Sequence, residues 1–129
     1  MTLRLHAFSL LVPDYDEGIA FYVGKVGFSL IEDTQLSANK RWVLIAPSPD
    51  TPQHILLARA DGPRQEAAIG NQTGGRVGFF LHSDDFDQDY KRMRAAGVTF
   101  EELPRSEPYG MVAVWRDPWG NRWDLLQLN

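Results

Sequence analysis

Hydrophobic positions recur at helical spacing in two stretches of the chain, and each stretch follows an apolar run. In the first stretch the spacing is four, three and four residues, at Tyr15, Ile19, Tyr22 and Val26. In the second it is four and three residues, at Phe86, Tyr90 and Met93. Because this spacing puts side chains on one side of a helix, the pattern predicts two amphipathic helices.

The two helices are parts of an internal repeat. Asp14 precedes the first helix and Asp85 the second, 71 positions later, and each is followed by an aromatic residue and another Asp. An aspartate in this place accepts hydrogen bonds from first-turn amides, so each helix is expected to begin there. Gly27 and Gly97 follow the periodic stretches and predict where the helices end. Two equivalent modules are therefore expected.

Strand-like runs follow each helix and are separated by proline, glycine and Asx residues. They cover residues 28–31, 41–46 and 54–58 in the first half, and 98–101, 111–115 and 122–127 in the second. With the apolar run before the helix, each half is a β-α-β-β-β module. We predict one α+β domain over residues 1–129, with a first module at about 1–60 and a second at about 76–129. The linker, about 61–75, is polar and glycine-rich, with one helical turn expected at 65–69.

Composition and charge limit which partners, compartments and metal ligands are expected for this protein. The chain has 129 residues, a net charge of −4 and no basic run longer than two residues, so no nucleic-acid partner is expected. No apolar run approaches the ~20 residues that span a bilayer, and no export signal is recognised, so we expect no membrane partner and a cytoplasmic protein. With no cysteine, only His, Asp and Glu are plausible metal ligands.

Several segments resemble the vicinal oxygen chelate superfamily, which includes glyoxalases, bleomycin-resistance proteins and extradiol dioxygenases. In chain order they are residues 10–14, 20–22, 26–28, 84–87, 95–98, 117–121 and 123–125, with sequences LLVPD, AFY, VGF, DDFD, AAGV, DPWGN and WDL. The resemblance covers nearly the whole chain. It implies paired β-α-β-β-β modules that form an open, U-shaped mixed sheet around a pocket.

The resemblance also implies where a metal site would lie. Metal-dependent members carry four ligands, on the first and last strand of each module. The corresponding positions are Ala7, Leu56, Gly78 and Asp124, and only Asp124 can ligate a metal. His6 is one residue from the first position, which puts it on the wrong side of a strand. We therefore expect no metal cofactor, with Asp124 as a weak candidate ligand.

The concave strand positions supply the candidate ligand-binding residues. Strand alternation would place Phe8, Leu10, Phe79 and Leu81 toward the helices, and that set is apolar. The residues expected at the pocket are Ser9, Trp42, His54, His82, Tyr109, Arg122 and Asp124. Structural alternatives stay open for four of them. His82 can touch water or cap the turn at Asp84, the same ambiguity applies to His54, and Arg122 can form an ion pair with Asp124. The other tryptophans, 115, 119 and 123, suit either a pocket wall or core and dimer packing.

Three classes of function are compatible with these features. The first is a glyoxalase/bleomycin-resistance-like protein that binds a small organic ligand without the standard divalent metal. The second is a glyoxalase-type lyase or dioxygenase with a shifted ligand set of His6, His54, His82 and Asp124. The third is a module that binds a partner protein. Whether the chain catalyses a reaction is open, as is the ligand. The abundance of aromatic residues leads us to expect a homodimer.

Overall fold

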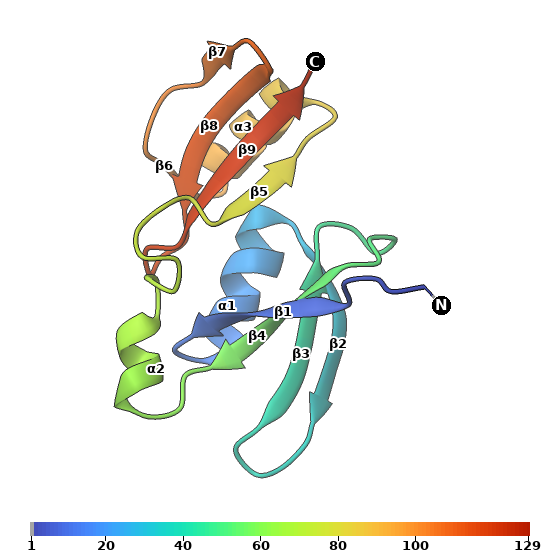
Figure 1. The fold of residues 1–129 in the computed structure, drawn as a ribbon, viewed down its shortest axis with the longest axis vertical. Coiled ribbons are helices and arrows are strands. Elements are labelled where there is room, and N and C mark those ends of the chain that lie inside the picture. The colour runs from blue at the N-terminus through green and yellow to red at the C-terminus, as the bar shows by residue number, and fades with distance from the viewer. Residues whose placement is uncertain (1) are drawn as a thin grey trace. The chain divides into compact units, whose positions relative to one another are not determined.

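The computed structural model describes residues 2–129, which divide after Ile69 into two compact units. Each unit contains one mixed sheet with a helix packed against it (Figure 1). The predicted α+β class is confirmed, as two mixed sheets rather than a closed barrel. No helix within residues 2–129 is long and apolar enough to cross a membrane.

The first unit follows the predicted β-α-β-β-β order. Its elements are β1 (Ala7–Val12), α1 (Tyr15–Phe21), the π-helical segment η1 (Tyr22–Val26), β2 (Ser29–Gln35), β3 (Arg41–Ala46), β4 (His54–Arg59) and α2 (Pro63–Ala68). The strands are arranged β1-β4-β3-β2, with β1 parallel to β4 and the other pairs antiparallel. α2 corresponds to the single helical turn expected in the linker.

The first helix begins where the sequence predicts and changes its winding near its end. The Asp14 carboxylate accepts a hydrogen bond from the Glu17 amide at 3.1 Å. The helix is α-helical only to Phe21, and η1 continues it with wider turns. The amides of Gly27 and Phe28 both donate to the Tyr22 carbonyl, and Gly27, at φ 98°, ends the helix. The helical segment therefore begins and ends where the sequence predicts, and its π-helical last turn was not predicted.

The second unit repeats this order with one additional strand. Its elements are β5 (Phe79–His82), α3 (Phe86–Ala95), β6 (Thr99–Phe100), β7 (Arg105–Glu107), β8 (Gly110–Arg116) and β9 (Arg122–Leu128). The sheet order is β5-β9-β8-β6, β5 is parallel to β9, and β7 also pairs with β8. The short strand β7 was not predicted, because its sequence, RSE, contains no apolar residue.

The second helix confirms the repeat. The Asp85 carboxylate accepts from the Gln88 amide at 3.2 Å, and Gly97 follows the helix at φ 96°. These features match Asp14 and Gly27 of the first unit. Equivalent sequence signals therefore produce equivalent helix ends.

Each unit has its own core between the sheet and its helix. In the first unit Leu10, Val43, Ile45 and Leu57 are buried. In the second, the Trp123 ring stacks on both Phe79 and Trp115, with centroid distances of 4.7 and 4.9 Å. Trp115 and Trp123 are thus core residues rather than pocket walls.

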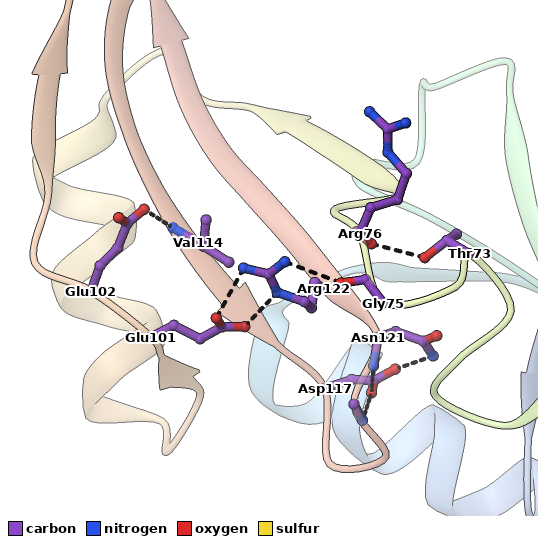
Figure 2. Close-up of polar contacts among 10 residues, drawn as sticks. Thr73, Gly75, Arg76, Glu101, Glu102, Val114, Asp117, Asn121 and Arg122 are labelled. Carbon is purple, nitrogen blue, oxygen red and sulfur yellow. Dashed lines mark hydrogen bonds and ion pairs between the residues drawn. The ribbon is translucent and has the colours of Figure 1, made fainter.

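The turn between β8 and β9 is held by one buried carboxylate. Asp117 Oδ1 accepts from the amides of Trp119, Gly120 and Asn121 at 2.9 to 3.0 Å. Its Oδ2 accepts from Asn121 Nδ2 at 2.7 Å (Figure 2). The turn predicted from the sequence DPWGN is confirmed. It fixes the point at which β9 begins, with Arg122 and Asp124 on it.

Candidate functional site

Alternating burial identifies one face of each sheet that its helix does not cover, and we call it the open face. On β4, Ile55 and Leu57 are buried while His54 and Leu56 are only partly so. Leu57 lies on the helix side, because a β carbon on Gly18 of α1 would contact its side chain. On β9, Trp123 and Leu125 are buried and their neighbours are half-buried.

The predicted parity of the strands agrees with this burial. Leu10 and Phe79, expected to face the helices, are buried, and Leu81 is half-buried. Phe8 belongs to the same set and is 41% exposed near the beginning of β1. Phe80, of the opposite parity, is 65% exposed.

Three of the predicted site residues, Ser9, Trp42 and His54, lie on the open face of the first sheet. Ser9 is opposite Leu56 in the register of β1 and β4, and His54 is opposite Ala7. Trp42 is on β3 and is half-buried. The first sheet therefore collects these residues on one face.

A cavity of about 670 Å³ opens on the first unit at the ends of β3 and β4. Trp42, Leu56 and Ala58 of the open face line it, together with Leu57 on the helix side of β4 and Tyr15 of α1. Its polar lining residues are Asn39, Lys40, Arg41, Arg59, Asp61 and Gln65. Of the seven predicted ligand-binding residues, Trp42 is the one that lines this cavity.

His54 lies beside His6 at the other end of β4. The two imidazole centroids are 5.5 Å apart in an edge-on arrangement, and the His54 amide donates to the His6 carbonyl. Within residues 2–129, the buried Nδ1 of His54 has no hydrogen-bond partner. The pair therefore brings two imidazole rings close together, and no third His, Asp or Glu in residues 2–129 joins them in a possible metal site.

Arg122 of the second unit forms its ion pair with a residue other than the predicted partner. Its guanidinium donates to both carboxylate oxygens of Glu101, at 2.9 and 3.1 Å, and to the Gly75 carbonyl at 3.1 Å (Figure 2). The predicted ion pair between Arg122 and Asp124 was wrong, because Glu101 from the adjoining β6 end supplies a two-point partner. Hydrogen bonding to Glu101 raises the pKa of Arg122.

Asp124 consequently forms no ion pair within the described residues, although the charges of Arg105 and Arg122 still act on it. It lies on β9 between Phe80 of β5 and Val114 of β8. Within the described residues, its buried Oδ1 has no hydrogen-bond partner. Burial raises the pKa of Asp124 above its ordinary value, and the charge of Arg105 opposes this only in part.

His82 and Tyr109 lie toward the margins of the second unit. His82 Nδ1 is 3.8 Å from an Asp84 carboxylate oxygen, and its Nε2 accepts from the Leu128 amide at 3.4 Å. These contacts correspond to the alternative in which His82 caps the strand end. Tyr109, in the turn between β7 and β8, is 48% exposed.

The four positions at which the resemblance implies metal ligands do not fit a metal ion. Ala7, Leu56 and Gly78 have no side-chain donor atom. A β carbon at position 78 would moreover overlap the γ-methyl group of Thr73. Across residues 2–129, no three His, Asp or Glu side chains are grouped so that they could hold a metal.

Most of the cavity lining was not identified from the sequence. Lys40 is in the turn before β3, Arg59 ends β4, and Gln65 is on α2. No spacing rule connects three surface residues on a turn, a strand end and a linker helix. The turn signals around residues 37–40 and 61–63 mark where such residues can meet, without indicating that they do.

The family assignment rests on the whole chain. The model of the Glyoxalase/Bleomycin resistance protein/Dioxygenase superfamily matches residues 4–125. The chain therefore belongs to this superfamily, as the sequence motifs predict.

Relatives with high coverage include both sequences and solved structures. An uncharacterized protein of Shewanella frigidimarina (strain NCIMB 400) is 53% identical over 122 residues, which cover 94% of this chain and 90% of the relative. The crystal structure of UcmS2 has 30% identity and a TM-score of 0.84, with 98% of each chain covered. TnmS3, described as an antibiotic binding protein from Streptomyces sp. CB03234, has 30% identity and a TM-score of 0.82, covering 99% of this chain and 98% of its own.

Proposed function

We propose that this protein binds a small organic molecule in the cavity of its first unit and sequesters it, without a divalent metal ion at the family's ligand positions. The observation that carries the proposal is the wall formed by Trp42, Leu56 and Ala58. Leu56 stands where the resemblance places a metal ligand, so this position contributes apolar surface. This wall therefore favours contact with the apolar part of a ligand.

The size and lining of the cavity suit such a ligand. Small-molecule pockets have volumes of about 300–1,000 Å³ and combine apolar walls with a few polar groups. The cavity, at about 670 Å³, lies within this range. The half-buried Trp42 offers a flat indole face, against which a planar ring can stack.

The comparisons support a binding role. TnmS3, with the same fold and 30% identity over nearly the full chain, is described as an antibiotic binding protein. By analogy we propose an antibiotic or similar small organic compound as the ligand of this chain, and the indole face of Trp42 favours one with a planar ring.

A thermal-shift screen of metal-stripped protein, in EDTA, tests the proposal. A panel of antibiotics that contain planar aromatic rings provides the probes, and native mass spectrometry then measures stoichiometry. We expect at least one compound to raise the melting temperature and to bind at one molecule per chain, since a ligand that binds only the folded state stabilises it. Binding that appears only after Ni²⁺ or Zn²⁺ is restored would contradict the proposal.

The alternative function is a metal-dependent lyase or dioxygenase with a shifted ligand set. The observation that favours it is the pair of His6 and His54, with centroids 5.5 Å apart and an unpartnered Nδ1. Catalytic zinc sites use three protein ligands, so the pair alone does not complete such a site. Metal titration separates the two functions, as set out in the Discussion.

The proposal extends to a cytoplasmic homodimer. Phe80 and Leu128 of the second sheet are large apolar residues with more than half of their surface exposed. Burying such residues against a second copy would remove apolar surface from water. Sedimentation equilibrium at micromolar concentration should give twice the chain mass of 14.6 kDa, and a mass of one chain would contradict the dimer. Cell fractionation tests the compartment.

A further inference from the structure

The cavity lies where two neighbouring strands separate. β3 and β4 pair from Ile45 opposite Ile55 as far as Val43 opposite Leu57, and no further within the described structure. Continuing the same register would place Trp42 opposite Ala58, yet these two residues do not pair.

Each strand keeps its other neighbour beyond this point. Trp42 is still opposite Thr34 of β2, and Ala58 is still opposite Leu11 of β1. The sheet is therefore intact on both sides of an opening between β3 and β4. The cavity is lined by strand residues from both sides of this opening, and also by Tyr15 of α1, Gln65 of α2 and the segments 39–40 and 60–61.

One of the cations at the opening is already neutralised. Arg41 donates to both oxygens of Asp33, at 3.1 and 2.7 Å, and to Asp16 at 2.9 Å. Its guanidinium also lies 5.3 Å from the centre of the Tyr15 ring. Two carboxylates hold the pKa of Arg41 above its ordinary value. Arg41 therefore lines the cavity with its charge already paired with two carboxylates.

Two other cations line the same cavity without a counter-ion. Lys40 and Arg59 form no ion pair with any carboxylate in residues 2–129. Asp61 is the single acidic residue of the lining. Lys40 and Arg59 are therefore the lining cations that remain unpaired. Counted with Arg41, Asp16, Asp33 and Asp61, the opening has three cations and three carboxylates and carries no net charge.

We infer that the cavity selects ligands in which an apolar ring system carries an anionic group, with the ring on Trp42 and the anion between Lys40 and Arg59. This inference rests on the proposed function and names the class of its ligand. The anion is an oxyanion such as a carboxylate, sulfonate or phosphate, since ammonium and guanidinium groups donate to any of these. Neutral ligands of the same ring shape would gain only the apolar contact.

A matched pair of fluorescent probes tests the charge preference. 1-Anilinonaphthalene-8-sulfonate is anionic, and N-phenyl-1-naphthylamine has the same rings without the sulfonate. Both are titrated into metal-stripped full-length protein and into Lys40→Met, Arg59→Met and Lys25→Met. Lys25 is an exposed lysine on η1 that does not line the cavity, so Lys25→Met controls for the change in net charge.

We expect Lys40→Met and Arg59→Met each to weaken binding of the sulfonate about threefold to tenfold, with less than a twofold change for the neutral probe. Raising the salt concentration should weaken the binding of the sulfonate probe but not that of the neutral probe, because salt screens exposed charges. Lys25→Met should change neither affinity.

The outcomes separate this inference from the proposed function. If both probes bind and Trp42→Ala weakens both, but Lys40→Met and Arg59→Met affect them equally, the charge preference is wrong and the binding cavity stands. If neither probe binds saturably, both the inference and the proposed function are overturned. Circular dichroism of each variant confirms that a loss of binding is not a loss of fold.

Discussion

Thr73 occupies the space that a side chain at position 78 would need. A β carbon built on Gly78 would overlap the Thr73 γ-methyl group, and the Thr73 hydroxyl is held by the Arg76 carbonyl at 2.8 Å (Figure 2). Position 78 is one of the four at which the resemblance implies a metal ligand. The local packing therefore opposes any side chain there, ligand or not.

Gly78→Ala should lower the free energy of unfolding by about 1–3 kcal/mol, since overpacking strains the neighbouring backbone or side chain. Thr73→Ala in the same chain should recover part of the loss, because it removes the overlapping methyl group. Urea denaturation measures both effects. Gly24→Ala is the matched control, as a β carbon on Gly24 meets nothing within 4 Å. Equal stability of Gly78→Ala and Gly24→Ala would refute the clash.

Asp14→Ala and Asp85→Ala should each lower stability by about 1 kcal/mol, because each carboxylate caps the first turn of its helix. Asp14→Asn and Asp85→Asn should retain most of the stability, since the amide oxygen can still accept. Thermal denaturation measures the four variants. An unchanged melting temperature in either alanine variant would mean that this residue does not act as the cap.

Asp124→Asn should become more stabilising, relative to the parent chain, as the pH rises from 3 to 7. The pKa of Asp124 is raised in the folded state, chiefly by burial, so folding disfavours its charged form. Below the ordinary pKa of 3.8, the Asp124 carboxyl is protonated in both the folded and the unfolded state, so its burial carries no charge penalty. Above 3.8 the carboxyl ionises more readily in the unfolded chain, and the folded state of the parent chain loses stability as the pH rises. Melting temperatures of both proteins across this range give the test. A difference that is constant with pH would contradict the raised pKa.

Titration of the metal-stripped protein with Ni²⁺ or Zn²⁺ should show no saturable binding below about millimolar concentration. Three of the four family positions have no donor atom, and a lone carboxylate binds such ions weakly. Calorimetry measures the affinity, and His54→Ala and His82→Ala identify the ligands if binding occurs. Micromolar binding that either variant removes would favour the metal-dependent alternative.

The sequence predicts the repeated parts of the fold well, because their signals are local. The Asp caps, the glycines after the helices and the strand alternation are each visible within a few residues. β7 was missed, since its pairing with β8 depends on position rather than on apolar pattern. The change of winding at Tyr22 likewise leaves no mark in the spacing of hydrophobic residues.

The candidate site could be predicted only in part. Trp42 was identified because a large ring on an open strand face is conspicuous. Lys40 and Arg59 line the same cavity because they lie at the ends of β3 and β4, where the pairing of these strands has stopped. For Arg122, sequence proximity favoured Asp124 as the partner, while the fold brings Glu101 closer from 21 positions away. Contacts between distant segments decide these details, and a single sequence does not display them.

The most direct test of the account is a fluorescence titration of metal-stripped protein with N-phenyl-1-naphthylamine, a neutral apolar probe that depends on no charged group. The parent chain, Trp42→Ala and Trp119→Ala are compared in EDTA. Trp119 lies in the turn between β8 and β9 and does not line the cavity, so it controls for the loss of an indole ring. We predict saturable binding at one probe per chain that Trp42→Ala weakens about tenfold and Trp119→Ala leaves unchanged. No saturable binding, binding that requires added Ni²⁺, or equal affinity in Trp42→Ala would contradict a metal-independent binding cavity on the first sheet.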